Sequence, residues 1–233
     1  MKICMKIPIK GVIISNDDKM VYEWFDMDST CPREVSKRIN EASGEELEVE
    51  INSPGGSVYA GSEIYTALMN YSGRVNVDIV GVAASAASVV AMAGGVVKIS
   101  PTAQIMIHNV RSRAEGDYRD LQHEANVSKN YNKSIANAYE IKTGMSRDQL
   151  LDLMDEETWL TAQKAKEYGF VDEVMFESEE LVASAYGDLM LPENVVNKIR
   201  NKIADNKKRG SEKAREMEAR LNLLKLRGVD AKC

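Results

Sequence analysis

The sequence holds few residues of the types that build metal sites and disulfide frameworks. Its 233 residues include 3 cysteines, far apart and without a CxxC pair, and 2 histidines, neither of them in an HExxH motif. These absences argue against a disulfide-linked fold and a zinc site, and they indicate a reducing compartment. A GxxxxGKS/T phosphate loop is also missing, which argues against an ATPase. We therefore expect no metal and no cofactor.

The chain is acidic, and its first residues carry no recognisable targeting signal. A formal net charge of −6 argues against a general nucleic-acid-binding protein. The opening stretch, MKICMKIPIKGVIIS, lacks the apolar block and the small-residue cleavage site of a signal peptide. We therefore expect a cytoplasmic protein that does not bind nucleic acid.

One uncharged run, from Ile79 to Val97, is nearly long enough to span a bilayer. It extends over 19 residues, but six are alanine, three are glycine and two are serine, so its hydrophobicity is weak. No basic cluster flanks the run closely. A buried strand followed by a buried helix is a better interpretation than a membrane span.

Strand-like segments alternate with helix-like segments along most of the chain. Alternating polar and apolar residues, or short apolar runs, predict strands at 46–52, 75–83, 96–100, 104–108 and 170–176. Helical spacing and capping residues predict helices at 57–71, 86–93, 115–142, 147–154 and 162–168. This order predicts an α/β fold with a largely parallel sheet and functional residues at the strand ends. The long helix at 115–142 has an apolar stripe made of Tyr118, Leu121, Ala125, Tyr131, Ile135, Ala138 and Ile141.

The composition changes near the C-terminus. Residues 192–233 hold 12 Lys and Arg against 6 Asp and Glu, whereas residues 1–191 carry a net charge of −12. Apolar residues with helical spacing lie on both sides of a KKRGS break. We expect an α/β domain at 1–191 and a basic helical tail at 192–233, which is either a docking segment or a solvated extension.

Ser85 lies where the strand at 75–83 is expected to turn into a helix. A serine needs a neighbouring base, an orienting acid and donors for the oxyanion before it can act as a nucleophile. The first N–H groups of a helix are unpaired, and the small side chains around Ser85 allow a substrate to approach closely. The alternative is that this run of alanine and serine simply permits tight helix packing.

His108 and His123 are the two candidates for the base. His108 ends the apolar strand at 104–108, whereas His123 lies on the polar side of the long helix. Residues that follow buried strands form the active sites of α/β folds, so His108 is preferred. The segment SPGG at 53–56 either provides a further N–H donor for the oxyanion or forms an ordinary tight turn. The acidic residues of MDEETWLTA either include the acid that orients the histidine or form a solvated helix end.

Four motifs in order resemble the Clp protease proteolytic subunit (ClpP) family. They are INSPGGSVYAGSEIY, GVAASAAS, IMIH and ETWLTAQKAKEYGFVDEV, and they cover roughly residues 48–175. The resemblance implies a ClpP/crotonase-type spiral of ββα units with a long handle helix through which rings stack. It also implies a serine endopeptidase in which the nucleophile is Ser85, the base is His108, and the oxyanion donors are the N–H groups of Gly56 and Ala86.

The chain departs from the family's usual pattern at two places. The family's catalytic Asp lies two residues before the aromatic of the last motif, and here Glu157 holds that position before Trp159. A Glu can still orient an imidazole, and Asp155 is the other candidate acid. The Pro expected soon after the catalytic His is missing, because Asn109 and Val110 follow His108.

The segment VYEWFDMDSTCPREVSKRINEA resembles the ClpP-related head maturation proteases of tailed phages and prophages. This resemblance implies a homo-oligomeric ring that cuts capsid or scaffold precursors in the host cytoplasm or the prohead interior. Two alternatives stay open. One is a housekeeping-type subunit that works with an AAA+ unfoldase, and the other is a crotonase-like assembly scaffold without catalysis.

Overall fold

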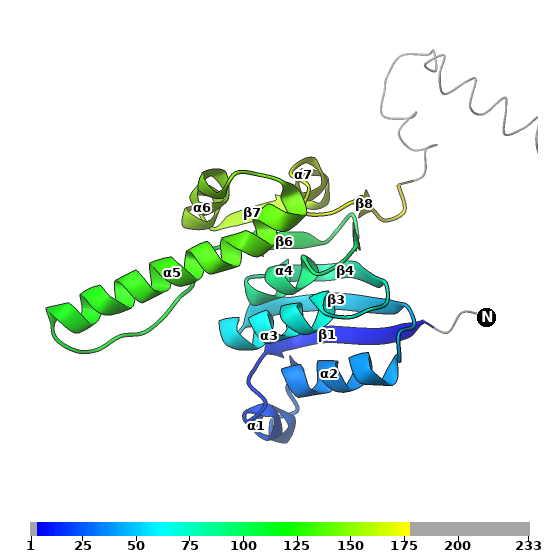
Figure 1. Ribbon diagram of the computed structural model, residues 1–233, viewed down its shortest axis with the longest axis horizontal. Coiled ribbons are helices and arrows are strands. Elements are labelled where there is room, and N and C mark those ends of the chain that lie inside the picture. Colours follow the sequence, from blue (N-terminus) through cyan, green and yellow to red (C-terminus); the bar gives the residue numbers. More distant parts are fainter. Residues whose placement is uncertain (1–3, 178–233) are drawn as a thin grey trace, which may run out of the picture. The chain divides into compact units, whose positions relative to one another are not determined.

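A computed structural model describes residues 4–177, which contain one eight-stranded sheet and seven helices (Figure 1). Six strands follow the order β2-β1-β3-β4-β5-β8, all paired in parallel. The predicted α/β class with a largely parallel sheet is confirmed. The strands are β1 (Met5–Ile13), β2 (Ser29–Thr30), β3 (Leu47–Gly56), β4 (Val75–Ala84), β5 (Val96–Ile99), β6 (Gln104–Ile107), β7 (Thr158–Thr161) and β8 (Glu173–Val174). The helices are α1 (Lys19–Trp24), α2 (Pro32–Glu41), α3 (Val58–Met69), α4 (Ala86–Ala91), α5 (Tyr118–Thr143), α6 (Arg147–Asp155) and α7 (Ala162–Glu167).

The sheet divides along β4, and this division creates the site described below. The first half of β4 pairs with β5, from Asn76 opposite Val96 to Ile79 opposite Ile99. The second half pairs with β6 instead, over 82–84 opposite 104–106. On its other side β6 pairs with β7, and that pair is antiparallel. The ends of β4 and β6 therefore lie side by side.

Within the described residues, helices cover one face of the sheet and leave the other face open. The helices α2, α3 and α4 lie next to one another across the covered face (Figure 1). Side chains alternate along β3, so that Leu47, Val49 and Ile51 are fully buried under these helices. The open face carries charged side chains that pair across neighbouring strands, such as Lys10 with Glu50 at 2.8 Å. Charge on the open face explains how a parallel sheet leaves one face uncovered.

The helix α5 extends beyond the rest of the described structure, and only its second half packs on the core (Figure 1). Its bounds agree with the predicted helix at 115–142, but the predicted apolar stripe is only partly right. Tyr118, Leu121 and Ile141 are exposed, whereas Ala136 and Tyr139, which the stripe omitted, are buried. The first turns of α5 have no core to pack against, so helical spacing alone could not identify the buried residues.

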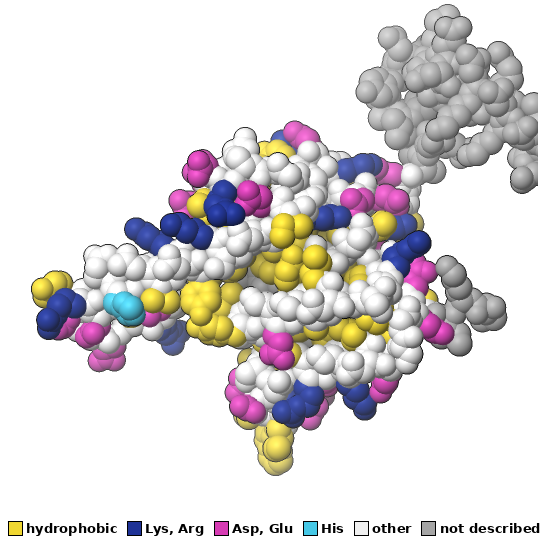
Figure 2. Space-filling model, viewed as in Figure 1, with side chains coloured by type: hydrophobic (Ala, Val, Ile, Leu, Met, Phe, Trp, Pro, Cys, Tyr) yellow, Lys and Arg dark blue, Asp and Glu magenta, His cyan; other side chains and the backbone are white. Residues whose placement is uncertain are grey.

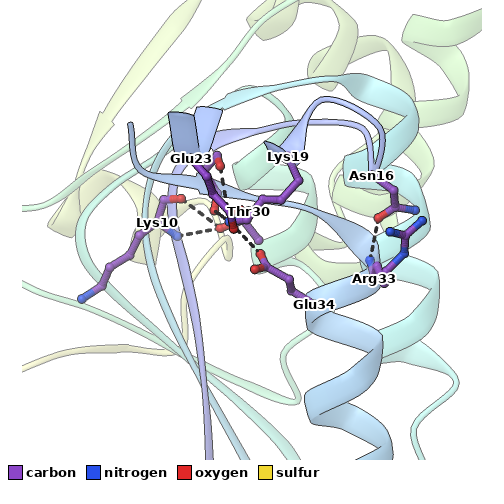
Figure 3. Close-up of polar contacts among 8 residues, drawn as sticks. Lys10, Asn16, Lys19, Glu23, Thr30, Arg33 and Glu34 are labelled. Atoms are coloured by element: carbon purple, nitrogen blue, oxygen red, sulfur yellow. Dashed lines mark hydrogen bonds and ion pairs between the residues drawn. The ribbon is translucent and has the colours of Figure 1, made fainter. Parts of the chain in front are cut away.

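The sequence predicted no element before residue 46, and the structure adds β1, α1, β2 and α2 there. Polar contacts hold α1 in place, as Figure 3 shows. The Lys19 ammonium donates to the Ser29 carbonyl at 2.9 Å and forms an ion pair with Glu34 at 3.0 Å. The Thr30 hydroxyl donates to the Lys10 carbonyl at 2.9 Å. Exposed apolar side chains cluster at α1, towards the lower edge of Figure 2. They are Met20, Val21, Trp24 and Phe25.

Three other expectations differ from the structure or lie outside it. The turn at 53–56 does not end its strand, because β3 continues through Gly56 beside β1. The predicted last strand at 170–176 is reduced to β8, and β7 was not predicted. The boundary after residue 191 and the basic helical tail at 192–233 lie outside the described residues.

Within residues 4–177, no helix is long and apolar enough to span a membrane.

Candidate active site

Ser85 occupies a strained turn between β4 and α4. Its backbone angles are φ 54° and ψ −123°, a region that residues other than glycine rarely adopt. The backbone on both sides of the turn is tied down, because the Ser85 N–H donates to the Met106 carbonyl at 2.9 Å and the Ser85 carbonyl accepts from the Ser88 N–H at 3.0 Å. Strain at one half-buried residue, held by fixed neighbours, is a feature of functional sites.

His108 follows β6 directly and faces Ser85. The distance between His108 Nε2 and Ser85 Oγ is 2.7 Å, which is a short hydrogen bond. The parallel pairing of Ala84 with Met106 brings the two side chains together, since each follows one of these paired strand ends. The structure therefore places the predicted nucleophile beside the predicted base. His123 is exposed on α5, as expected.

The surroundings of His108 keep its imidazole neutral. Burial lowers the pKa of His108 below its ordinary value, and the nearby Arg111 guanidinium lowers this pKa further. The Glu157 carboxylate acts in the opposite direction and raises the pKa of His108. Because the two lowering effects prevail, the ring is unprotonated at neutral pH and its free nitrogen can accept a proton from a hydroxyl.

The SPGG turn lies against the start of α4. A side chain at Gly55 would come within 2.5 Å of the Ala84 carbonyl oxygen and 2.9 Å of the Ala86 nitrogen, so only glycine fits. Gly55 has φ +87° and Gly56 has φ +148°, and both values favour glycine. The buried Ser53 hydroxyl supports the turn, because it donates to the Gly11 carbonyl at 2.6 Å and accepts from the Gly55 N–H at 3.1 Å.

One cavity of about 470 Å³ connects these residues. Gly56, Ser85, Ala86 and His108 all line it, so four of the five predicted site residues share one space. The rest of the wall is largely apolar and comes from α3, α4, β6, α5 and the segment between β6 and α5. It is formed chiefly by Val58, Tyr59, Val89, Met106, Val110 and Ile135.

The two candidate acids are engaged with other partners. The Asp155 carboxylate accepts a hydrogen bond from the Asn109 side-chain amide at 2.6 Å. Glu157 accepts from the guanidinium of Arg111 and forms an ion pair with it. Across residues 4–177, the structure gives His108 no hydrogen bond to either acid. Glu157 is nevertheless close enough to act on the pKa of His108.

A second hydroxyl supports the turn at Ser85. The fully buried Ser88 donates its hydroxyl hydrogen to the Ser85 carbonyl at 2.6 Å, and its oxygen lies 2.8 Å from the Tyr139 hydroxyl on α5. Burial raises the pKa of Tyr139 far above the ordinary range, so the phenol stays protonated. Sequence reasoning missed the roles of Ser88, Tyr139 and Arg111. The signal for Ser88 was a second serine in an otherwise apolar run.

Within residues 4–177, no three His, Cys, Asp or Glu side chains come together in a way that could hold a metal ion. The arrangement that the described part of the chain does present is a serine hydroxyl, a neutral imidazole and a glycine turn around one cavity. These groups can carry out acyl transfer, in which the hydroxyl attacks a carbonyl and the imidazole receives the proton.

Comparison with known proteins points to the same class of site. A family model described as Clp protease matches residues 38–178. The chain is 39% identical over 134 residues to the ATP-dependent Clp protease proteolytic subunit of Bacteroides fragilis, a match covering 57% of this chain and 65% of that protein. It is 32% identical over 140 residues to the ATP-dependent Clp protease proteolytic subunit 1 of Salinibacter ruber, covering 59% of this chain and 60% of that protein. The chain thus spans less than two thirds of the length of these curated relatives.

A solved structure of a ClpP1 mutant from Listeria monocytogenes resembles the described fold. The TM-score is 0.62 at 24% sequence identity, and the likeness covers 76% of this chain and 93% of that one. At this identity the likeness shows the fold, which is the ClpP type expected from the sequence. Because the Clp protease model also matches more than half of the sequence, the chain belongs to the Clp protease family.

Proposed function

We propose that the chain is a serine endopeptidase. The observation that carries the proposal is the 2.7 Å contact between Ser85 Oγ and His108 Nε2 at a strained turn. The pKa of His108 is lowered, so the imidazole is free to accept the hydroxyl proton as Ser85 attacks a peptide carbonyl. His108 then gives this proton to the leaving amine, and water hydrolyses the acyl-enzyme by the same route.

The N–H groups of Gly56 and Ala86 are proposed to bind the oxyanion. Both residues line the cavity beside Ser85. Ala86 begins α4, and the first N–H groups of a helix have no partner within that helix. Donors placed where negative charge develops stabilise the tetrahedral intermediate without reorganisation.

Glu157 is proposed as the acid that orients His108, with Asp155 as the reserve. When Nε2 accepts from Ser85, the other ring nitrogen carries the hydrogen and needs an acceptor. Glu157 is supported by its electrostatic effect on His108 and by its place at the start of β7. In this proposal its carboxylate turns from Arg111 to His108 in the catalytically competent arrangement.

A fluorophosphonate probe tests the proposal directly, because it reacts only with an activated serine. We expect the probe to label Ser85 in the wild type, and peptide mapping by mass spectrometry identifies the site. The label should vanish in Ser85→Ala and in His108→Ala, and either substitution should lower peptide hydrolysis by about 10³-fold or more. Labelling that survives in His108→Ala, or hydrolysis that survives in Ser85→Ala, would refute this assignment.

We further propose that the physiological role is prohead maturation, with capsid or scaffold precursors as substrates of a homo-oligomeric ring. This role is supported by the segment around α1, which precedes the residues that the Clp protease model matches. It presents Trp24 and Phe25 to solvent on a helix fixed by Lys19. Co-expression with candidate capsid precursors should yield Ser85-dependent cleavage.

A housekeeping-type role with an AAA+ unfoldase is the second candidate. It is favoured by the names of the relatives, which are subunits of ATP-dependent proteases. Affinity purification separates the two roles, since recovery of an AAA+ ATPase with stimulated proteolysis favours the second. Ring formation without any serine labelling would instead favour the third possibility, an assembly scaffold.

A further inference from the structure

A single guanidinium group borders the cavity that holds the proposed nucleophile. Arg111 lies in the segment between β6 and α5 and lines the same cavity as Ser85 and His108. Its side chain is 74% exposed, so a bound peptide can reach it. The proposed hydrolysis does not require this positive charge, which makes His108 a weaker base. The position of Arg111 therefore calls for a separate explanation.

Arg111 is the only permanently charged residue among the described residues that line this cavity. The remaining wall consists of apolar, aromatic, glycine and hydroxyl-bearing side chains together with His108. A peptide bound in the cavity therefore lies near one positive charge, and none of the described wall residues is a carboxylate. A guanidinium binds carboxylates through paired N–H donors, which gives geometric as well as electrostatic selectivity.

The present partner of Arg111 can be exchanged. Glu157 forms the ion pair from outside the cavity wall, and its side chain is 41% exposed. Ion pairs between exposed groups are worth little, because water solvates both partners well. A guanidinium also has five N–H donors, more than one carboxylate can use. A second carboxylate can therefore replace Glu157 or bind beside it.

We propose that Arg111 is a specificity-determining residue that binds an acidic side chain of the substrate close to the scissile bond. This inference rests on the proposed endopeptidase function and names its substrate class, which is peptides with Asp or Glu at a position near the cleaved bond. A substrate carboxylate that replaces Glu157 also frees Glu157 from Arg111. The acidic substrate then completes the arrangement in which Glu157 orients His108.

Paired quenched-fluorescent peptides test the inference. Each pair is identical except for one Glu or Gln, and this position is moved stepwise across the cleavage site. At one position the wild type should cleave the Glu peptide about 10-fold faster in kcat/KM, the size of one charge-assisted hydrogen bond weakened by exposure. Arg111→Gln should abolish this preference and Arg111→Lys should retain part of it. Arg111→Glu should reverse it, so that the Gln peptide is cleaved faster than the Glu peptide.

Arg113→Gln is the matched control, since Arg113 is an exposed arginine of the same segment that does not line the cavity. It should keep the wild-type preference. Equal cleavage of every Glu and Gln pair by the wild type, or an unchanged preference in Arg111→Gln, overturns the inference and leaves the protease assignment standing. If no peptide is cleaved and the fluorophosphonate does not label Ser85, the proposed function fails, and the inference fails with it.

Discussion

The Ser88 hydroxyl joins the turn at Ser85 to the long helix α5 by accepting a hydrogen bond from Tyr139. The two oxygens are 2.8 Å apart, and the single hydrogen of the Ser88 hydroxyl is already donated to the Ser85 carbonyl. Tyr139 must therefore be the donor, which its raised pKa allows. The backbone of Ser85 is thus held from α5 as well as from its own strand.

The two linked hydrogen bonds, from Tyr139 to Ser88 and from Ser88 to the Ser85 carbonyl, predict that substitutions at Ser88 and Tyr139 have non-additive effects on stability. Ser88→Ala should lower the free energy of unfolding by about 2 kcal/mol, because it leaves the Tyr139 hydroxyl buried without a partner. Tyr139→Phe should cost about 1 kcal/mol. In the double variant the loss should be smaller than the sum, since no orphaned hydroxyl remains. Urea unfolding of the four proteins measures the coupling, and strict additivity would show that the two groups act independently.

The strain at Ser85 predicts an unusual order of stabilities. Ser85→Gly and Ser85→Ala both lose the hydrogen bond to His108, so they should be equally inactive. Glycine adopts φ 54° without strain, whereas alanine, like the native serine, adopts it only under strain. Ser85→Gly should therefore be the more stable of the two by about 1 kcal/mol. Thermal unfolding of both variants decides this, and a less stable glycine variant would argue against strain at the turn.

Two glycines with positive φ should differ sharply in their tolerance of alanine. Gly44 has φ +91° with nothing within 4 Å of an added Cβ, so Gly44→Ala should cost only backbone strain, about 1 kcal/mol. In Gly55→Ala the same strain is joined by a collision with the Ala84 carbonyl and the Ser85 Cβ. We expect Gly55→Ala to lose serine labelling, and Gly44→Ala to keep it. Labelling of Gly55→Ala at the wild-type rate would contradict this reading of the turn.

The acid limb of the pH profile should move in opposite directions in two variants. The acid limb of kcat/KM reports the pKa of the free base, which must be unprotonated to act. Arg111→Gln removes a cause that lowers the pKa of His108, so activity should be lost at higher pH than in the wild type. Glu157→Gln removes a cause that raises this pKa, so the limb should shift to lower pH. Peptide hydrolysis measured across pH 5 to 8, where His titrates, tests both signs. Identical limbs in all three proteins would mean that His108 is not the titrating base.

Local patterns predicted β3, β4, β5, β6 and a longer version of β8, but not β1, β2 or β7. Strands such as β3 and β4 alternate buried and less buried residues, and this period can be read from the sequence. Ser85 and His108 became candidates because they lie at the ends of apolar strands, and the resemblance to the ClpP family implied their roles. The structure adds that these two strands are neighbours, which only long-range pairing can show.

Features that depend on distant residues could not be predicted. Arg111 and Glu157 are 46 positions apart, and nothing near either of them in the sequence indicates a pairing. The strand β7 is short and carries the exposed Trp159, so it lacks the pattern of a buried strand. The exposed side of α5 was misjudged because an apolar residue has the same helical spacing whether or not a partner surface lies beside it.

The pairing of β4 with β6 has a consequence for how this kind of site can change over time. The separation of Ser85 and His108 depends on backbone hydrogen bonds, including the one from the Ser85 N–H to the Met106 carbonyl. A thiol in place of the hydroxyl would inherit the same position relative to the imidazole. The backbone pairing of β4 with β6 therefore does not depend on which side chain is at position 85. Evolution can change the chemistry at this position without changing the backbone that positions it.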